Sequence, residues 1–182
     1  MMKYFCVFLF LSFSLCCIAQ KSNKHEKKEH IEKKLFPQNA LELLNNTLPE
    51  KVKEVTFYKE QDSIKISYKT TLKYNKHKYS ITFNKKGILK DIEVTVKQKC
   101  IPPKTLEKIK KHLYNKYSPF RIKKVQRQYN NMSTIDASTV IKNAFSNDQK
   151  SSYLYKVITE VKAKKERYFV NIIFAKNGDL SL

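Results

Sequence analysis

The chain of 182 residues contains only two glycines, and both end the same kind of phrase. One phrase runs from Phe83 to Gly87 and the other from Phe174 to Gly178, each with an aromatic residue four positions before the glycine. Glycine is the residue that most easily adopts a positive φ, so the phrase predicts a strand that ends in a tight turn. A turn used twice indicates that the chain repeats an earlier unit.

Further blocks of sequence keep the same order and spacing around these phrases. Phe36-Pro37 followed by Leu41 matches Ile101-Pro102 followed by Leu106, and Tyr68-Lys69 matches Tyr155-Lys156. The positions that mark the repeat are Pro49, Tyr68, Phe83 and Gly87 in the first copy, and Pro119, Tyr155, Phe174 and Gly178 in the second. Chance matches in a lysine-rich composition are the alternative. Four blocks in one order favour a duplication.

Each copy predicts a helix followed by strands. Pro37 suits the first position of a short helix that ends near Asn46, and Pro102 and Pro103 open a longer one with an apolar stripe from Leu106 to Tyr117. Apolar residues then alternate with polar ones, which is typical of antiparallel strands with one exposed face. We expect strands at about 51–59, 63–74, 77–84 and 88–97 in the first copy, and at about 120–129, 152–163 and 167–175, with a short one beyond Gly178, in the second.

These elements predict an α+β fold of two tandem repeats, each a helix packed on an antiparallel sheet of about four strands. The expected organisation is a leader at 1–19, a disordered charged tail at 20–35, a first repeat at 36–98 and a second at 99–182 with an inserted loop at 130–150. That insertion predicts a brief helix from Ser138, as its cap, to Phe145. Unique loops on a repeated scaffold are candidate partner surfaces, and a plain connecting loop is the alternative.

The N-terminus has the features of a secretory signal peptide. Lys3 provides the positive start, Tyr4 to Ile18 is an apolar run that is short for a membrane span, and Ala19 is a small residue before a cleavage point. We predict a Sec-type leader cleaved after Ala19, a secreted or periplasmic protein, and no integral membrane span afterwards. Lipidation is less favoured because no small residue precedes Cys16 or Cys17.

Removal of the leader would leave Cys100 alone, so no internal disulfide could form. We expect Cys100 to be a part-buried linker residue, with a reactive or dimerising thiol as the alternative. The charge is +21, from 37 basic and 16 acidic residues. Only three of the basic residues are arginine, which favours compositional bias over selected phosphate recognition. Such a charge still attracts anionic partners at low salt.

No catalytic constellation emerges from the sequence. His25 and His30 are five residues apart, whereas zinc-protease helices place two histidines four apart on one face. Cys100 and His112 would need an orienting third group and a cleft to act as a nucleophile pair. No phosphate-binding glycine loop or Cys/His ligand set is present. We therefore predict no enzyme activity, no catalytic, cofactor-binding or metal-binding residues, and no cofactor.

Tyrosine is the residue type that could carry recognition. Rigid amphipathic rings on an exposed sheet face bind partners at low entropic cost, whereas rings on the other face would belong to the core. The strand tyrosines are Tyr68, Tyr74, Tyr79, Tyr153, Tyr155 and Tyr168. The alternation places Tyr79 on the same face as Ile81 and Phe83, which indicates the core for that ring.

Residues 36 to 182 resemble the PepSY-like, β-lactamase-inhibitor-like family of secreted proteins. The residues that carry the resemblance are Pro49, Val52, Val55, Tyr68, Phe83, Gly87 and Leu89, and again Pro119, Ile122, Val125, Tyr155, Phe174, Gly178 and Leu180. The resemblance implies tandem helix-on-sheet units and a non-catalytic binding role, including inhibition of an enzyme. The chain departs from the family in its lack of tryptophan and its strong basicity, and no inhibitor contact residue carries across.

Two functions remain open at the level of sequence. The first is a secreted interaction module whose concave sheet face or 130–150 loop binds a protein partner, as an inhibitor or regulator of an envelope or extracellular enzyme. The second is an electrostatic binder of polyanions such as nucleic acid, acidic glycan or an anionic membrane surface. Salt separates them, because binding by counterion release weakens steeply with salt.

Overall fold

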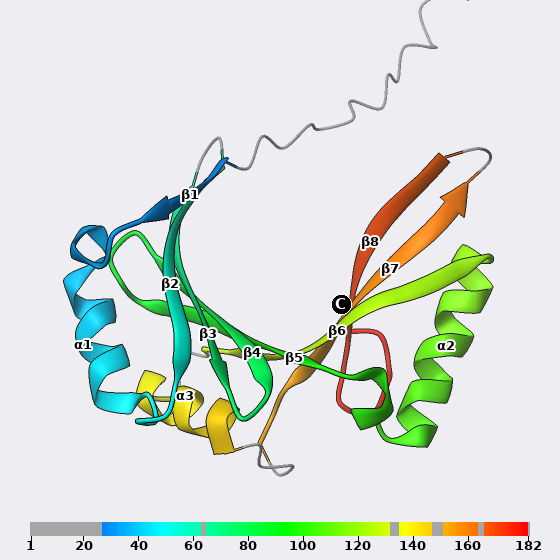
Figure 1. The fold of residues 1–182 in the computed structure, drawn as a ribbon. Coiled ribbons are helices and arrows are strands. Elements are labelled where there is room, and N and C mark those ends of the chain that lie inside the picture. Colours follow the sequence, from blue (N-terminus) through cyan, green and yellow to red (C-terminus); the bar gives the residue numbers. More distant parts are fainter. Residues whose placement is uncertain (1–26, 63–64, 132–134, 147–150, 164–165, 182) are drawn as a thin grey trace, which may run out of the picture.

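A computed structural model describes residues 27–62, 65–131, 135–146, 151–163 and 166–181. Eight antiparallel strands form one sheet in which spatial order follows sequence order, from β1 to β8 (Figure 1). The leader predicted at 1–19 and the first part of the predicted tail lie outside the described residues. The elements are β1 (Lys27–Ile31), α1 (Gln38–Thr47), β2 (Lys53–Gln61), β3 (Ile66–Tyr74), β4 (His77–Asn84), β5 (Leu89–Val96), α2 (Pro103–Tyr117), β6 (Phe120–Asn130), α3 (Ala137–Ser146), β7 (Leu154–Ala163) and β8 (Glu166–Phe174), with 3-10 turns at Lys33–Leu35 and Gln98–Cys100.

The predicted fold of two separate helix-on-sheet repeats is wrong. Strands β5 and β6 pair along their length, from Val96 opposite Val125 to Asp91 opposite Asn130. This ladder joins the strands of both halves into a single sheet. Two four-stranded sheets would have four edges of unpaired backbone groups, whereas the joined sheet has only two. The sequence repeat therefore does not divide the structure into two units.

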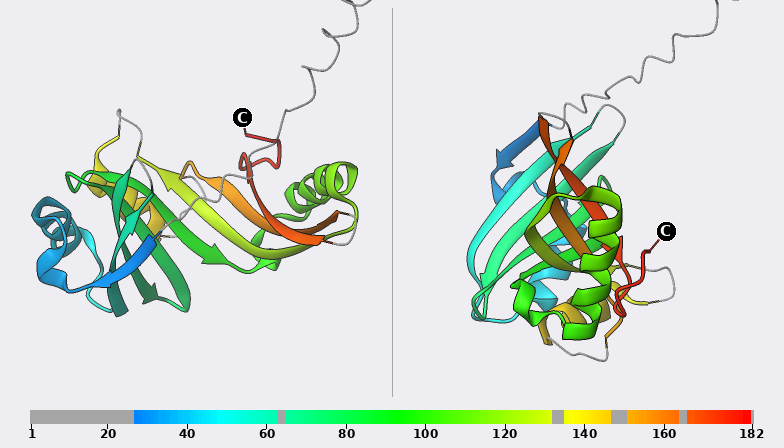
Figure 2. Two further views of the ribbon diagram at one scale, coloured as in Figure 1. Left: turned by 90° about the horizontal axis from the view of Figure 1, so that it is seen from above. Right: turned by 90° about the vertical axis from the view of Figure 1, so that its right-hand side faces the viewer.

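The sheet is strongly curved, and α1, α2 and α3 lie on its convex side (Figures 1 and 2). Because successive side chains of a strand point to opposite faces, every second side chain points to the convex side and forms the core with the helices. The fully buried large side chains are Leu72, Ile81, Phe83, Ile92, Ile109, Leu113, Ile141, Tyr155, Val157 and Phe174. Of the helices in the described residues, none lies on the concave side (Figure 2).

Aromatic contacts attach the helical segments to the sheet. Phe36, just before α1, is 4% exposed and packs its ring 4.9 Å from that of Phe57 and 5.7 Å from that of Phe83, between ring centroids. On α3, Phe145 stacks on Tyr79 with centroids 4.2 Å apart. Tyr79 is buried, as its alternation predicted. These contacts fix where α1 and α3 lie against the convex side.

The two glycines occupy similar turns, as the repeated phrase predicted. Gly87 has φ of 76° and Gly178 has φ of 90°, and the amide of each donates to a carbonyl three residues earlier. A Cβ added at Gly87 would lie 3.0 Å from Pro37 Cβ and 3.1 Å from the Ala40 nitrogen in the α1 segment, and one at Gly178 would lie 2.8 Å from the Thr105 oxygen in α2. Each turn therefore lies against the start of a helix, although the two halves share one sheet.

Four local expectations need correction. Lys27–Ile31, expected within a disordered tail, forms β1 because it pairs with β2 and buries Ile31 against Phe57. Cys100, expected to be part-buried, is exposed. The helix expected near Ser138 is confirmed as α3, but the carboxylate of Asp136, not Ser138, accepts from the first-turn amides. Beyond Gly178, residues 179–181 form an isolated bridge, Phe174 to Leu180, and not the expected short strand.

Candidate functional site

The concave face of the sheet is a broad surface that none of the described helices covers (Figure 2). Its side chains are those that alternate with the buried ones, and the strand register orders them in rows across the sheet. One row runs through Lys73, Lys78, Thr95, Gln126 and Lys156, which lie opposite one another on β3 to β7. The surface is thus polar, and its backbone is held by hydrogen bonds from both neighbouring strands.

Three glutamates on the concave face are nearly buried by basic neighbours. Near the β1 edge, Glu60 is 7% exposed and its carboxylate lies 2.7 Å from Lys69 Nζ and 3.4 Å from Lys28 Nζ. At the centre, Glu93 accepts from Lys156 Nζ at 2.5 Å and from Gln126 Nε2 at 2.9 Å. Each carboxylate therefore holds extended side chains in place along the sheet.

The third glutamate lies at the other side of the sheet. Glu160 is 14% exposed and lies 2.6 Å from Lys123 Nζ and 3.2 Å from Arg167 Nη1. Hydrogen bonds from Lys123 and Arg167 lower the pKa of this carboxyl. The negative charge on all three glutamates is thus compensated within the face.

The central acidic pair has opposite pKa shifts. Burial and the neighbouring Glu93 carboxylate raise the pKa of Asp91, against a hydrogen bond from Thr82. Burial also disfavours ionisation of Glu93, but the hydrogen bonds from Lys156 and Gln126 outweigh it and lower the pKa of Glu93. Burial lowers the pKa of the nearby Lys124. Glu93 is therefore the carboxylate around which the central lysines are organised.

Basic side chains outnumber acidic ones on the concave face. The basic residues assigned to it by register and ion pairing are Lys28, Lys53, Lys69, Lys73, Lys78, Arg121, Lys123, Lys124, Lys156, Lys162 and Arg167, and the acidic ones are Glu54, Glu60, Asp91, Glu93 and Glu160. Since the glutamates are already paired, the excess charge is available to an anionic surface. A partner with an acidic patch would complement it.

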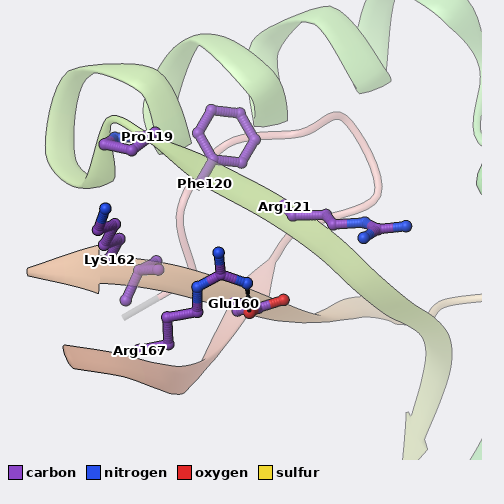
Figure 3. A pocket seen from close by; sticks show the side chains of 7 residues that line it. Pro119, Phe120, Arg121, Glu160, Lys162 and Arg167 are labelled. Atoms are coloured by element: carbon purple, nitrogen blue, oxygen red, sulfur yellow. Dashed lines mark hydrogen bonds and ion pairs between the residues drawn. The ribbon is translucent and has the colours of Figure 1, made fainter. Parts of the chain in front are cut away.

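A pocket of about 270 Å³ lies beside the start of β6, the end of β7 and the start of β8 (Figure 3). Its lining includes Arg121 and Arg167, which are two of the three arginines in the chain. Arg167 points toward Glu160, while Arg121 extends from the adjacent strand away from that pair (Figure 3). Pro119 and Phe120 supply apolar wall. The pocket combines guanidinium groups with an apolar surface, a combination suited to an acidic side chain and its flanking carbon atoms.

The predicted recognition tyrosines lie on the convex side. Tyr79, Tyr153 and Tyr155 are buried, and Tyr68 and Tyr74 pack against the core. The ring of Tyr153 lies 5.0 Å from the Arg127 guanidinium carbon, within the core beside α3. Tyr168 on β8 lies on the same side but is 44% exposed. Most of these rings therefore stabilise the fold and do not form the concave surface.

The predicted repeat markers do not gather into one site. Tyr68, Phe83, Tyr155 and Phe174 lie in or against the core along different strands, and Gly87 and Gly178 form turns beside different helices. Pro49 and Pro119 follow α1 and α2, respectively. Within the described ranges, no three side chains of His, Cys, Asp or Glu come close enough to hold a metal ion. Of the described helices, none is both long and apolar enough to cross a membrane.

The sequence analysis did not identify the three ion-paired glutamates of the concave face or the exposed Phe169. Glu60, Glu93 and Glu160 each occupy an exposed-face position of an alternating strand, so their face could have been assigned. Their basic partners come from other strands, and those pairs depend on register, which the sequence did not provide. Phe169 is 65% exposed and lies opposite Glu160.

Comparison with known proteins identifies structures with a similar fold, but it does not assign the chain to a family. No family model matches the chain. No curated protein matches it either. Among solved structures, a DUF2874 family protein from Bacteroides ovatus superposes with a TM-score of 0.52 at 14% identity, over 79% of this chain and 83% of that one. A BLIP-like protein from Bacteroides fragilis superposes with a TM-score of 0.51 at 15% identity, over 81% and 85%.

These neighbours support the β-lactamase-inhibitor-like part of the resemblance at the level of fold. They do not show the PepSY-like part. A fold of this kind is compatible with a non-catalytic binding module, and it does not by itself assign a partner.

Proposed function

We propose that the chain is a non-catalytic binding module that holds a protein partner against the concave face of its sheet. The observation that carries this proposal is the curved, helix-free face whose carboxylates are already paired with fixed basic side chains. A surface ordered before binding loses less side-chain entropy on association. Its shape and excess of basic groups suit a convex partner with an acidic patch.

We also propose where the protein acts in the cell and what it does to its partner. The apolar run from Tyr4 to Ile18 after Lys3 favours secretion or a periplasmic location, with cleavage after Ala19. Inhibition or regulation of an envelope or extracellular enzyme follows as the proposed role, in keeping with the BLIP-like fold neighbour.

The excess of lysine on the concave face favours one second candidate, an electrostatic binder of polyanions. Its affinity would come from counterion release and would fall steeply with salt. A shape-complementary protein interface of roughly 1,600 Å² depends less on salt. Adding positive charge to the face should therefore have opposite consequences for the two functions.

We expect the double substitution S80R/T95R to abolish capture of the protein partner. Ser80 and Thr95 are half-buried on adjacent central strands of the concave face, so two long side chains there would hold a partner away from the sheet. The measurement is affinity capture from the envelope and secreted fractions of the source cell at two salt concentrations, with bound proteins quantified by mass spectrometry.

The matched control is N46R/N115R, which adds the same charge at exposed positions on α1 and α2. The proposal expects this control to capture as the unaltered chain does, at both salt concentrations. Equal or stronger capture by S80R/T95R, lost in high salt, would contradict the proposal and favour the polyanion binder.

A further inference from the structure

The outer edge of β8 ends the sheet on the side opposite β1 (Figure 1). At its end the chain folds back, and Ser181 donates its amide to the Ile173 carbonyl. That bond shows that the Ile173 backbone groups point outward, so those of Arg167, Phe169 and Asn171 point outward too by alternation. Within the described residues no strand pairs with them. The edge thus presents a row of alternating donors and acceptors.

Beyond Glu166 and Arg167 at its start, β8 lacks the features that usually protect an edge strand from pairing. Residues 168–175 contain no charged residue and no proline, in a chain where 37 of 182 residues are basic. The β7–β8 ladder has no register shift over its nine pairs. By contrast, the opposite edge strand β1 has five residues and includes Lys27 and Lys28. Charges, prolines, bulges and short length are the usual defences of an edge.

Exposed aromatic rings flank the same edge on both sides. Phe169 is 65% exposed on the concave side, and Tyr168 is 44% exposed on the other. Adjacent strand residues point to opposite faces, so an added strand would cover both rings at once. Large exposed rings beside an open ladder indicate a surface that is covered in a complex.

The charged side chains beside the β8 edge indicate which kind of molecule could bind there. Lys162 lies opposite Arg167, and Arg121 lies opposite Glu160, whose carboxylate is already bound by Lys123 and Arg167. The net field here is positive. A second copy of the chain, with its own charge of +21, would be repelled, whereas acidic side chains would be attracted.

We propose that the open edge of β8 binds an extended, acidic polypeptide segment, which adds to the sheet as a ninth strand. A peptide backbone matches alternating amides and carbonyls, which a nucleic acid or glycan cannot do. Acidic side chains of the segment on the concave side reach the pocket with Arg121 and Arg167, while apolar ones cover Phe169. This inference shares with the proposed function only the assumption that the partner is a polypeptide. The edge of β8 would be a second binding surface, outside the centre of the concave face.

The test compares Asn171→Pro with Asn171→Ala. Asn171 is exposed and its amide points outward, so proline removes an edge donor without removing a β7 bond, and alanine keeps the donor. A displayed library of random peptides is selected on the unaltered chain. We expect the enriched peptides to be acidic, to bind N171A as they bind the unaltered chain, and to lose about tenfold or more in affinity on N171P.

A second arm keeps the inference testable if N171P fails to fold. An enriched peptide is synthesised with N-methyl groups at alternate residues, in both registers, and titrated against the unaltered chain. One register should lose binding and the other should keep it, because only one set of amides faces β8. No enrichment of acidic peptides, or equal binding in both registers, would overturn the inference. Neither result affects the S80R/T95R capture experiment, which tests the concave face. Failure of this inference is therefore distinct from failure of the proposed function.

Discussion

Replacing Gly178 with alanine is expected to lower the free energy of unfolding by about 3 kcal/mol, from the cost of a positive φ together with overpacking. The backbone at Gly178 has φ of 90°, a conformation that residues with a Cβ rarely adopt. An added Cβ would also lie 2.8 Å from the Thr105 carbonyl oxygen and 3.1 Å from Lys108 Cβ. Because the closest atom is helix backbone, the turn and α2 would have to separate. Chemical denaturation monitored by circular dichroism measures the change.

Two comparisons isolate the cause. Gly87→Ala places a Cβ 3.0 Å from Pro37 Cβ and 3.1 Å from the Ala40 amide nitrogen, so we expect a smaller loss of about 2 kcal/mol. Lys85→Ala, at an exposed position of the same turn as Gly87, should change stability by less than about 0.5 kcal/mol. A Gly178→Ala protein as stable as the Lys85→Ala protein would show that the turn does not pack on α2 in this way.

The second large effect is expected for Phe36→Ala, at about 4 kcal/mol of lost stability, the range for buried phenylalanine truncations. The Phe36 ring is 4% exposed and contacts the rings of Phe57, Tyr68 and Phe83, with centroid distances of 4.9, 5.6 and 5.7 Å. Its removal would leave a cavity between the α1 segment and three strands. Thermal and denaturant unfolding would both report the loss.

The neighbouring residue provides the control. Leu35 is 60% exposed, so Leu35→Ala should cost less than about 0.5 kcal/mol although it removes a similar apolar side chain from the sequence. Similar losses for the two substitutions would mean that Phe36 is not the anchor of the α1 segment.

Local patterns in the sequence were sufficient to place most secondary structure. Alternating runs such as Tyr79, Ile81 and Phe83 predicted strands and their buried face, and the stripe with Ile109 and Leu113 predicted α2. The two glycines predicted turns because their φ values require a residue without Cβ. Each of these inferences depends on neighbours within one element.

Long-range pairing could not be predicted in the same way. Repeated blocks favoured two units, but the β5–β6 ladder depends on two strands that the whole of α2 separates in sequence. The short charged strand β1 has too few apolar residues to signal a strand, and its stability comes from pairing with β2. Nothing in the local pattern distinguishes Glu60 and Glu93 from other strand carboxylates, because their lysine partners lie on other strands. Local periodicity contains no information about such partners.

Lysine footprinting of the partner-bound protein tests the central claim most directly. Amine-reactive labelling, followed by peptide mass spectrometry, reports the accessibility of lysines on both sides of the sheet. We predict that Lys73, Lys78 and Lys124, exposed on the concave face, lose reactivity in the complex, while Lys104 and Lys111 on α2 keep theirs. Protection of the α2 lysines with unchanged labelling of Lys73, Lys78 and Lys124 would contradict binding through the concave face.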